Sequence, residues 1–155
     1  MARNKFKFMS VENILKQFIE TLRSNLSQHN ASGKLSDSLK YTIKFDGKIF
    51  SVSIRAESYL KYLEHGTKPH WPPVDAIREW IRVKPVLPRP LPNGQLPTRE
   101  QLAFLIGRKI SKYGTKPTHV LSRTKDQFRL AENVYKAFQA EYLRMMQEEL
   151  HKTLN

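Results

Sequence analysis

Hydrophobic residues follow two different spacings along this chain, and each spacing predicts its own kind of structure. Between Ser10 and Gln28 apolar residues recur every three or four positions, which predicts an amphipathic helix with Ser10 as its N-cap. From Leu39 to Ile54 the period is two, as in strands with one buried face. Helical spacing returns after Pro73. The order of these segments predicts an α+β fold with an N-terminal helix, an antiparallel hairpin or small sheet covered by helices, and a long C-terminal helix.

The alternating segment predicts a β-hairpin. Asp46-Gly47 lies between its two halves and favours a two-residue turn. That turn pairs Phe45 with Lys48 and puts the large residues on one face. The expected opposed pairs are Ile43 with Phe50, Tyr41 with Val52, and Leu39 with Ile54. Because an isolated hairpin is marginal in water, we expect the apolar stripes of the first and last helices to cover it.

The middle of the chain contains shorter elements. Residues 59–65 suit one or two helical turns but also a third strand, and the pattern leaves both open. Pro72-Pro73 opens a helix that runs to about Val83. Residues 84–97 hold five prolines and predict an ordered, extended arm. Its apolar residues, which we expect to be at least partly buried, are Val86, Leu87, Leu91 and Leu96.

Two further helices are predicted in the second half. Thr98 and Gln101 form a capping box for a helix that stops at Gly114, with a basic face made by Arg99, Arg108, Lys109 and Lys112. The last helix runs from about Lys125 to Lys152. Its apolar stripe is Phe128, Ala131, Tyr135, Phe138, Tyr142 and Met145. This stripe is interpreted either as a core face that covers the hairpin or as a surface that packs on a neighbouring copy.

One tetrapeptide, Gly-Thr-Lys-Pro, occurs twice, at 66–69 and at 114–117, each time after a helical segment. In each copy the glycine is expected to adopt the left-handed conformation past the helix end, and the proline prevents the helix from resuming. His70 and Trp71 follow the first copy, and His119 follows the second. These residues offer contact chemistry and no recognisable catalytic set, which favours an interaction protein.

Composition narrows the class of protein. A chain of 155 residues fits a single domain, residues 1–155, with one core, and no apolar run approaches the roughly 20 residues that span a bilayer. The chain has no cysteine, and its first ten residues lack the pattern of a secretory signal. We therefore expect no disulfides, a location in the cytoplasm and no membrane contact.

The net charge is +13, and it is unevenly distributed. Residues 99–129 contain eight basic and two acidic residues, giving +6, whereas residues 130–155 contain three basic and four acidic ones, giving −1. Such a field attracts nucleic acid and acidic protein surfaces alike. Lys68 and Lys116 are interpreted either as solvated lysines or as contacts to acidic surface on a partner, in which case reversing both charges weakens assembly.

Enzymatic motifs are missing from the sequence. Gly-Thr-Lys-Pro lacks the spaced glycines of a phosphate-binding loop, and His65, His70 and His119 match no standard zinc-ligand spacing. We expect no enzymatic activity, no catalytic residues, no cofactor and no metal.

Trp71 has two interpretations, a lid on the local core or an interface anchor.

The order of these segments resembles the small head-to-tail joining proteins of tailed bacteriophages, also called neck or tail-completion proteins. The resemblance covers roughly residues 10–150 and is sharpest at Tyr62–Thr67, Tyr-Leu-Glu-His-Gly-Thr, followed by a histidine and prolines. It implies a structural, non-enzymatic virion protein. The proline-rich arm at 84–97 is longer than many members have there.

The resemblance also implies an assembly. The expected partners are a homo-oligomeric ring of about 12 copies, the portal, neighbouring neck or tail proteins, and DNA passing through the channel. The expected contact regions are residues 29–34, 59–73, the arm and residues 114–121. The residues expected at interfaces are Tyr62, Glu64, Gly66, Thr67, Lys68, His70, Trp71, Lys116 and His119. The alternative function is a basic nucleic-acid-binding protein that uses the Arg99–Lys112 helix face and the lysines between 34 and 48.

Overall fold

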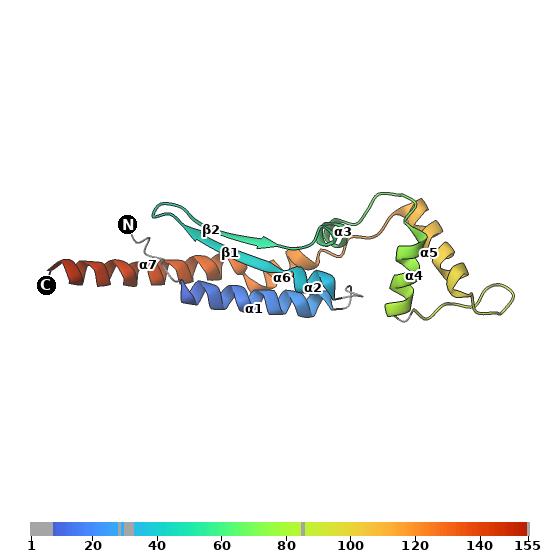
Figure 1. The fold of residues 1–155 in the computed structure, drawn as a ribbon, viewed down its shortest axis with the longest axis horizontal. Helices are drawn as coiled ribbons and strands as arrows, with labels where there is room; N and C mark the ends of the chain where they lie inside the picture. Colours follow the sequence, from blue (N-terminus) through green and yellow to red (C-terminus); the bar gives the residue numbers. More distant parts are fainter. Residues whose placement is uncertain (1–7, 28, 30–32, 85, 155) are drawn as a thin grey trace. The chain divides into compact units, whose positions relative to one another are not determined.

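The computed structural model describes residues 8–27, 29, 33–84 and 86–154 (Figure 1). Its elements are α1 (Met9–Leu26), α2 (Lys34–Ser38), β1 (Lys40–Phe45), β2 (Phe50–Arg55), α3 (Tyr59–His65), α4 (Val74–Val83), α5 (Arg99–Tyr113), α6 (Val120–Phe128) and α7 (Leu130–Leu154). The predicted α+β class is confirmed. The open choice at 59–65 resolves to a helix, α3.

The chain divides into two compact units. Met1–Asn25, Ser38–Ala56 and Val120–Asn155 form the first, and Leu26–Asp37 with Glu57–His119 form the second. Each unit has its own cluster of buried side chains, where the sequence predicted one core. The reason is local, because the α4 and α5 apolar faces are long enough to bury each other.

In the first unit the hairpin lies along α1 and α7 (Figure 1). Buried Phe8, Val11, Leu15 and Val134 form the centre of this cluster. The hairpin side chains that pack on it are Tyr41, Ile43, Phe45, Phe50 and Val52. The predicted cover of the hairpin by the first and last helices is therefore confirmed. Aromatic rings fill the middle, with Phe50 stacked on Phe138 at a centroid distance of 4.1 Å.

The predicted hairpin register is wrong by two residues. Phe45 pairs with Phe50, and Ile43 with Val52, so the connection is Asp46 to Ile49, four residues instead of two. The Asp46 carboxylate explains the longer loop, because its Oδ1 accepts hydrogen bonds from the Lys48 and Ile49 amides at 2.9 and 2.8 Å. A shift of two keeps every side chain on its predicted face, so the core is unaffected.

The ends of two helices differ from the prediction. The first helix begins at Met9, so Ser10 lies inside it and is not its N-cap. The Ser10 amide instead donates 2.7 Å to Oε1 of Glu141, a buried residue of α7. A distant carboxylate therefore satisfies a first-turn amide that a local cap would otherwise have served.

The last helix is broken. It begins at Val120 and is interrupted by Arg129, whose φ is 48°. The Asn133 side chain donates 2.7 Å to the Phe128 carbonyl, which stabilises the end of α6. The predicted stripe is only partly correct, because Phe128, Phe138, Tyr142 and Met145 are half-buried whereas Ala131 and Tyr135 are exposed. The break shifts the buried face of α7 to one centred on Val134 and Glu141.

In the second unit α4 packs on α5. Ile77 and Ile81 of α4 and Ala103 of α5 are buried together. The predicted capping box is confirmed: the Gln101 amide donates to Thr98 Oγ1 at 3.3 Å, and Gln101 Oε1 accepts from the Thr98 amide at 2.9 Å. Val86 of the arm packs on this cluster, but Leu87 and Leu96 are exposed, which corrects their expected burial.

Candidate interaction surface

The two Gly-Thr-Lys-Pro loops have the same backbone geometry. Gly66 has φ 70° and ψ −172°, and Gly114 has φ 67° and ψ −162°. These values differ from the expected left-handed helical conformation and fall in a region open essentially to glycine alone. Each glycine amide donates to a carbonyl four residues earlier, Gly66 to Tyr62 at 2.9 Å and Gly114 to Ile110 at 2.8 Å. Both loops thus close a helix in the same way.

The two loops pair with each other. Thr67 and Thr115 form an antiparallel bridge in which each amide donates to the other carbonyl at 3.2 Å. Their hydroxyls lie 3.0 Å apart. Figure 1 shows the segments that follow α3 and α5 side by side. The repeated motif is therefore the two halves of one junction, in place of two separate exposed loops.

The glycines are required because the backbones meet here. A Cβ on Gly114 would overlap the Thr67 carbonyl oxygen and lie 2.9 Å from the Lys68 carbonyl carbon. A Cβ on Gly66 would overlap the Thr115 carbonyl oxygen and lie 2.9 Å from the Pro117 nitrogen. Any larger residue at either position must push the strands of the junction apart.

The second loop also satisfies the end of α3. The Thr118 amide and hydroxyl both donate to the Leu63 carbonyl, at 2.8 and 2.7 Å, and the His119 amide donates 3.3 Å to the Glu64 carbonyl. These carbonyls in the last turn of α3 have no partner within the helix. His119 reaches this position with φ 52°. The His119 backbone therefore has a structural role within the second unit, while its side chain is exposed.

The junction brings most of the predicted interface residues together. It contains Gly66 and Thr67, and the lysines that follow the two bridged threonines, Lys68 and Lys116, are both exposed. His70 is exposed and its Nδ1 is 2.9 Å from the Lys68 carbonyl oxygen, which fixes the turn after the loop. Tyr62 is half exposed on α3. Of the predicted contact segment 29–34, residues 30–32 lie outside the described residues.

Glu64 does not lie on the surface. Only 4% of it is exposed, so its predicted place at an interface is wrong. It occupies a position on the inner side of α3, as does Leu60, which is also buried. A four-residue spacing places these two on one helical face, a signal that could have been read from the sequence.

Trp71 lies against α5 and remains half exposed. Its ring is 5.8 Å from that of Phe104, and the two planes are tilted by 58°. A Cβ on Gly107 would lie 3.9 Å from Trp71 Cζ2, an ordinary van der Waals distance, so the indole also lies close to this part of α5. Trp71 is 52% exposed and Phe104 50%. The contact with Phe104 supports Trp71 as a cover on the local core, and its role as an interface anchor stays a prediction. No pattern in the sequence indicates that Phe104 is its neighbour.

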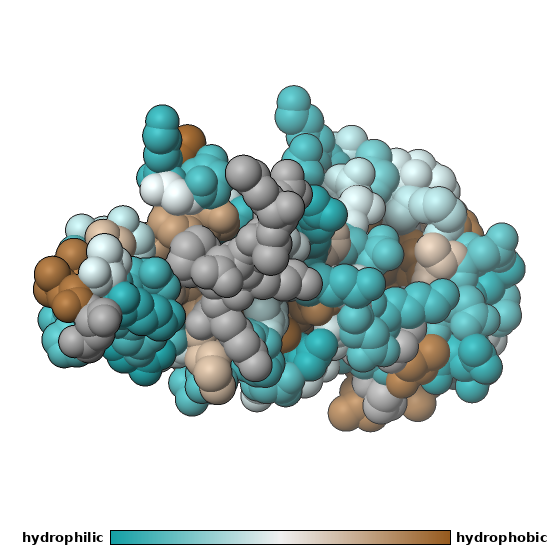
Figure 2. Space-filling view, turned by 60° about the vertical axis from the view of Figure 1, so that its left-hand side comes forward, coloured by the Kyte–Doolittle hydropathy of each residue, from teal (hydrophilic) through white to brown (hydrophobic). Residues whose placement is uncertain are grey.

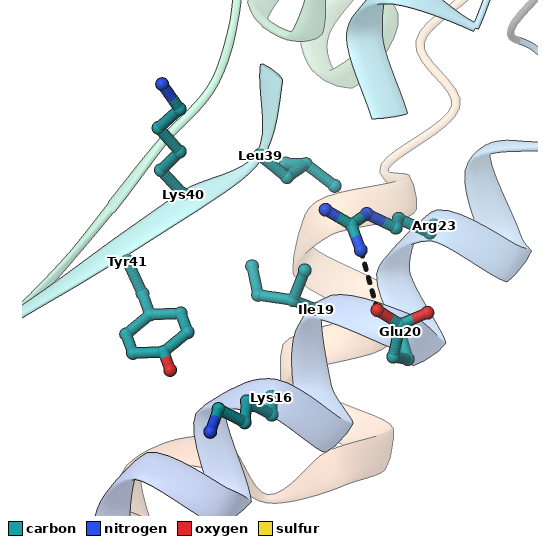
Figure 3. Close-up of a pocket in the computed structure, with 7 residues that line it drawn as sticks. All are labelled: Lys16, Ile19, Glu20, Arg23, Leu39, Lys40 and Tyr41. Carbon is teal, nitrogen blue, oxygen red and sulfur yellow. Dashed lines mark hydrogen bonds and ion pairs between the residues drawn. The ribbon is translucent and has the colours of Figure 1, made fainter. Parts of the chain in front are cut away.

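A shallow groove of about 360 Å³ lies between α1 and β1 in the first unit (Figure 3). Its cations are largely neutralised. Arg23 pairs with Glu20 at 2.6 Å, and Lys16 with Glu12 at 3.1 Å, a hydrogen bond that raises the pKa of the Lys16 ammonium. Burial raises the pKa of the Tyr41 phenol, which also lies near Glu12. Two of the three cations that line the groove are thus paired with carboxylates, and the third is Lys40.

Two searches bear on other kinds of site. Within the part of the chain that the structure describes, no group of three or more histidine, aspartate or glutamate side chains is arranged to hold a metal ion. None of the described helices is long and apolar enough to cross a bilayer. Comparison with protein-family models, with curated proteins and with solved structures finds no match to this chain.

Proposed function

We propose that this chain is a structural subunit of a tailed-bacteriophage virion. In this proposal, copies form a ring at the neck that joins the portal to the tail and surrounds the DNA channel. Two things support it: the resemblance of the sequence to neck proteins, and a second apolar face on α7. The second is the observation that carries the proposal.

The apolar face in question is the α7 outer stripe, made of Leu143, Met146, Leu150 and Leu154. These residues are 61%, 46%, 58% and 82% exposed. Their spacing of three and four residues places them on one side of the helix, about 16 Å long. The residues that α7 turns toward the hairpin, such as Phe138 and Met145, lie on the opposite side. α7 is therefore apolar on two faces, as is typical of a helix that also contacts another subunit.

Of the two interpretations of the predicted stripe, the core face is the one that applies, since Phe138 and Met145 pack on the hairpin cluster. In this proposal a different set of residues, the α7 outer stripe, contacts the neighbouring copy. The visible surface in Figure 2 is mostly hydrophilic, with separate apolar patches. Four side chains form only the centre of a contact, since a stable interface covers about 800 Å² on each partner. Surrounding polar residues must complete it.

The test replaces Leu143 and Leu150 with glutamate in cells infected by a phage that lacks the gene. The supplied wild-type chain is expected to restore joined particles, and the Leu143→Glu/Leu150→Glu chain to leave separate heads and tails. A matched control is Ile49→Glu/Val83→Glu, which also removes two exposed apolar residues and adds two negative charges. The proposal is wrong if the stripe variant joins heads to tails as well as this control does.

A second candidate function is nucleic-acid binding, and one observation favours it. Arg99, Arg108, Lys109 and Lys112 of α5 are all exposed, as the sequence predicted. Tight binding to DNA with a steep dependence on salt, measured by mobility shift, would support this function. Weak retention that salt abolishes would favour the neck ring.

A further inference from the structure

The outward side of α5 combines large apolar side chains with unpaired cations. We define the α5 outer face as Trp71, Phe104, Leu105, Arg108 and Lys112. Phe104, Arg108 and Lys112 follow one another at four-residue steps, and Leu105 lies next to them on the same side. Trp71 extends this band by its ring contact with Phe104. All five residues are exposed. The band is contiguous and belongs entirely to the second unit.

The cations of this face have no acidic partner among the described residues. The ion pairs of the described chain fall elsewhere, on α1, α4 and the segment from Arg129 to Lys152. Arg108 and Lys112 appear in none of them. Their charge is therefore available to whatever covers the face.

A second copy of this chain is poorly suited to supply the missing acid. Most acidic residues on its helices already pair with a nearby lysine or arginine, namely Glu12, Glu20, Asp75, Glu79, Glu132, Glu148 and Glu149. Each added copy also brings a further charge of +13. Self-assembly alone therefore accumulates repulsion, which an acidic partner of another kind would relieve.

The apolar part of the face decides between acidic partners. A DNA backbone offers phosphates to Arg108 and Lys112 but little apolar surface to cover Phe104 and Leu105. The Trp71 and Phe104 rings lie against each other, so each has less free surface on which a base could stack. Tryptophan and arginine beside exposed aromatic surface are typical of protein–protein contact centres.

We infer that the α5 outer face binds an acidic amphipathic segment of a different protein, with apolar side chains on Phe104 and Leu105 and carboxylates on Arg108 and Lys112. The inference rests on the proposed function, which requires neighbours in the neck that are not copies of this chain. It adds the chemistry of one such neighbour and the surface that receives it.

The test uses a fluorescent helical peptide with leucines along one side and glutamates on the others, and measures its affinity by anisotropy at about 0.15 M salt. A second peptide has alanine in place of each leucine and the same number of glutamates. The full-length chain is expected to bind the leucine peptide at least about tenfold more tightly than the alanine peptide. Arg108→Glu/Lys112→Glu and, separately, Phe104→Ala are each expected to weaken binding at least about tenfold.

Two control variants make the result specific. Arg123→Glu/Lys125→Glu makes the same charge change on exposed α6 residues that form no ion pair with any described carboxylate. Tyr113→Ala removes an exposed aromatic ring from the far side of α5. Both are expected to bind the leucine peptide like the unmodified chain. The inference is overturned if the chain binds the two peptides with equal affinity, or if the control variants lose as much affinity for the leucine peptide as the α5 variants do. It is also overturned if the chain binds a DNA duplex or a thymidine oligonucleotide more tightly than the leucine peptide. So would a self-associated species, seen by sedimentation, that Arg108→Glu/Lys112→Glu disperses.

The inference and the proposed function fail separately. The Leu143→Glu/Leu150→Glu chain keeps its α5 outer face, so it is expected to bind the leucine peptide normally while failing to join heads to tails. If that variant joins particles normally but peptide binding depends on Phe104 and Arg108, the acidic-partner inference stands and the neck ring falls. If the Leu143→Glu/Leu150→Glu chain fails to join particles and the unmodified chain binds both peptides equally, the neck ring stands and the acidic-partner inference falls.

Discussion

Replacing Gly114 with alanine tests the junction between the two Gly-Thr-Lys-Pro loops. Alanine places a Cβ against the Thr67 carbonyl oxygen, at a backbone position with φ 67° and ψ −162°. Holding a residue other than glycine in this region costs about 1–3 kcal/mol. If the clash opens the bridge, two backbone hydrogen bonds of 3.2 Å are lost as well, each worth about 0.5–1.5 kcal/mol. The free energy of opening the junction should therefore fall by about 2–6 kcal/mol.

Amide hydrogen exchange at Thr67 and Thr115 measures this quantity directly, because these amides are protected by the bridge itself. Gly94→Ala is the matched control, since Gly94 also has positive φ, at 79°, but a Cβ there would meet nothing within 4 Å. The control should leave the protection of both threonine amides unchanged. The reasoning is refuted if Gly114→Ala leaves that protection at the level of Gly94→Ala.

Three further predictions concern the first unit. Glu141→Ala removes the acceptor of the Ser10 amide and should lower the free energy of unfolding, measured by urea titration, by about 1.5–3 kcal/mol. Glu141→Gln keeps a carbonyl oxygen as acceptor and should cost less. Equal losses for the two variants would contradict the role of the hydrogen bond. Phe138→Ala, which removes a ring in contact with Phe8, Phe45 and Phe50, should cost about 3–5 kcal/mol, whereas the exposed Tyr135→Ala should change stability by less than about 0.5 kcal/mol. Hydrogen bonds from the Ile49 and Lys48 amides hold the pKa of the Asp46 carboxyl below its ordinary value of 3.8. The stability that the ionised carboxyl contributes is therefore present above that value and is lost as the pH falls through the lower folded pKa. Asp46→Ala should therefore be less stable than the unmodified chain at neutral pH, with the difference shrinking in acid; a difference that is constant with pH would contradict this.

The sequence was sufficient to predict the elements whose cause is local. The capping box at Thr98, the stop at Gly114 and the apolar face of the hairpin each depend on residues close in the chain. The hairpin register was missed because the Asp46 carboxylate competes with the two-residue turn that Asp-Gly favours. The break at Arg129 lacks a glycine or proline to mark it.

The candidate surface was predictable only in part. The repeated motif identified both loops, but nothing in its sequence indicates that Thr67 bridges Thr115, since that pairing depends on how α3 and α5 end in space. The resemblance predicts Glu64 at an interface, although its spacing from Leu60 indicates the buried side of α3. The α7 outer stripe was not predicted, because the apolar spacing through Tyr135 and Phe138 indicates only one apolar face on this helix.

Localising the chain in the purified virus particle tests the central claim most directly. A cryo-electron microscopy map of the particle, combined with quantitative mass spectrometry, gives both the position and the copy number of the chain. The account predicts a closed ring of about 12 copies between portal and tail, with the α7 outer stripe covered by the adjoining subunit. Particles that join head to tail normally without containing the chain would contradict it.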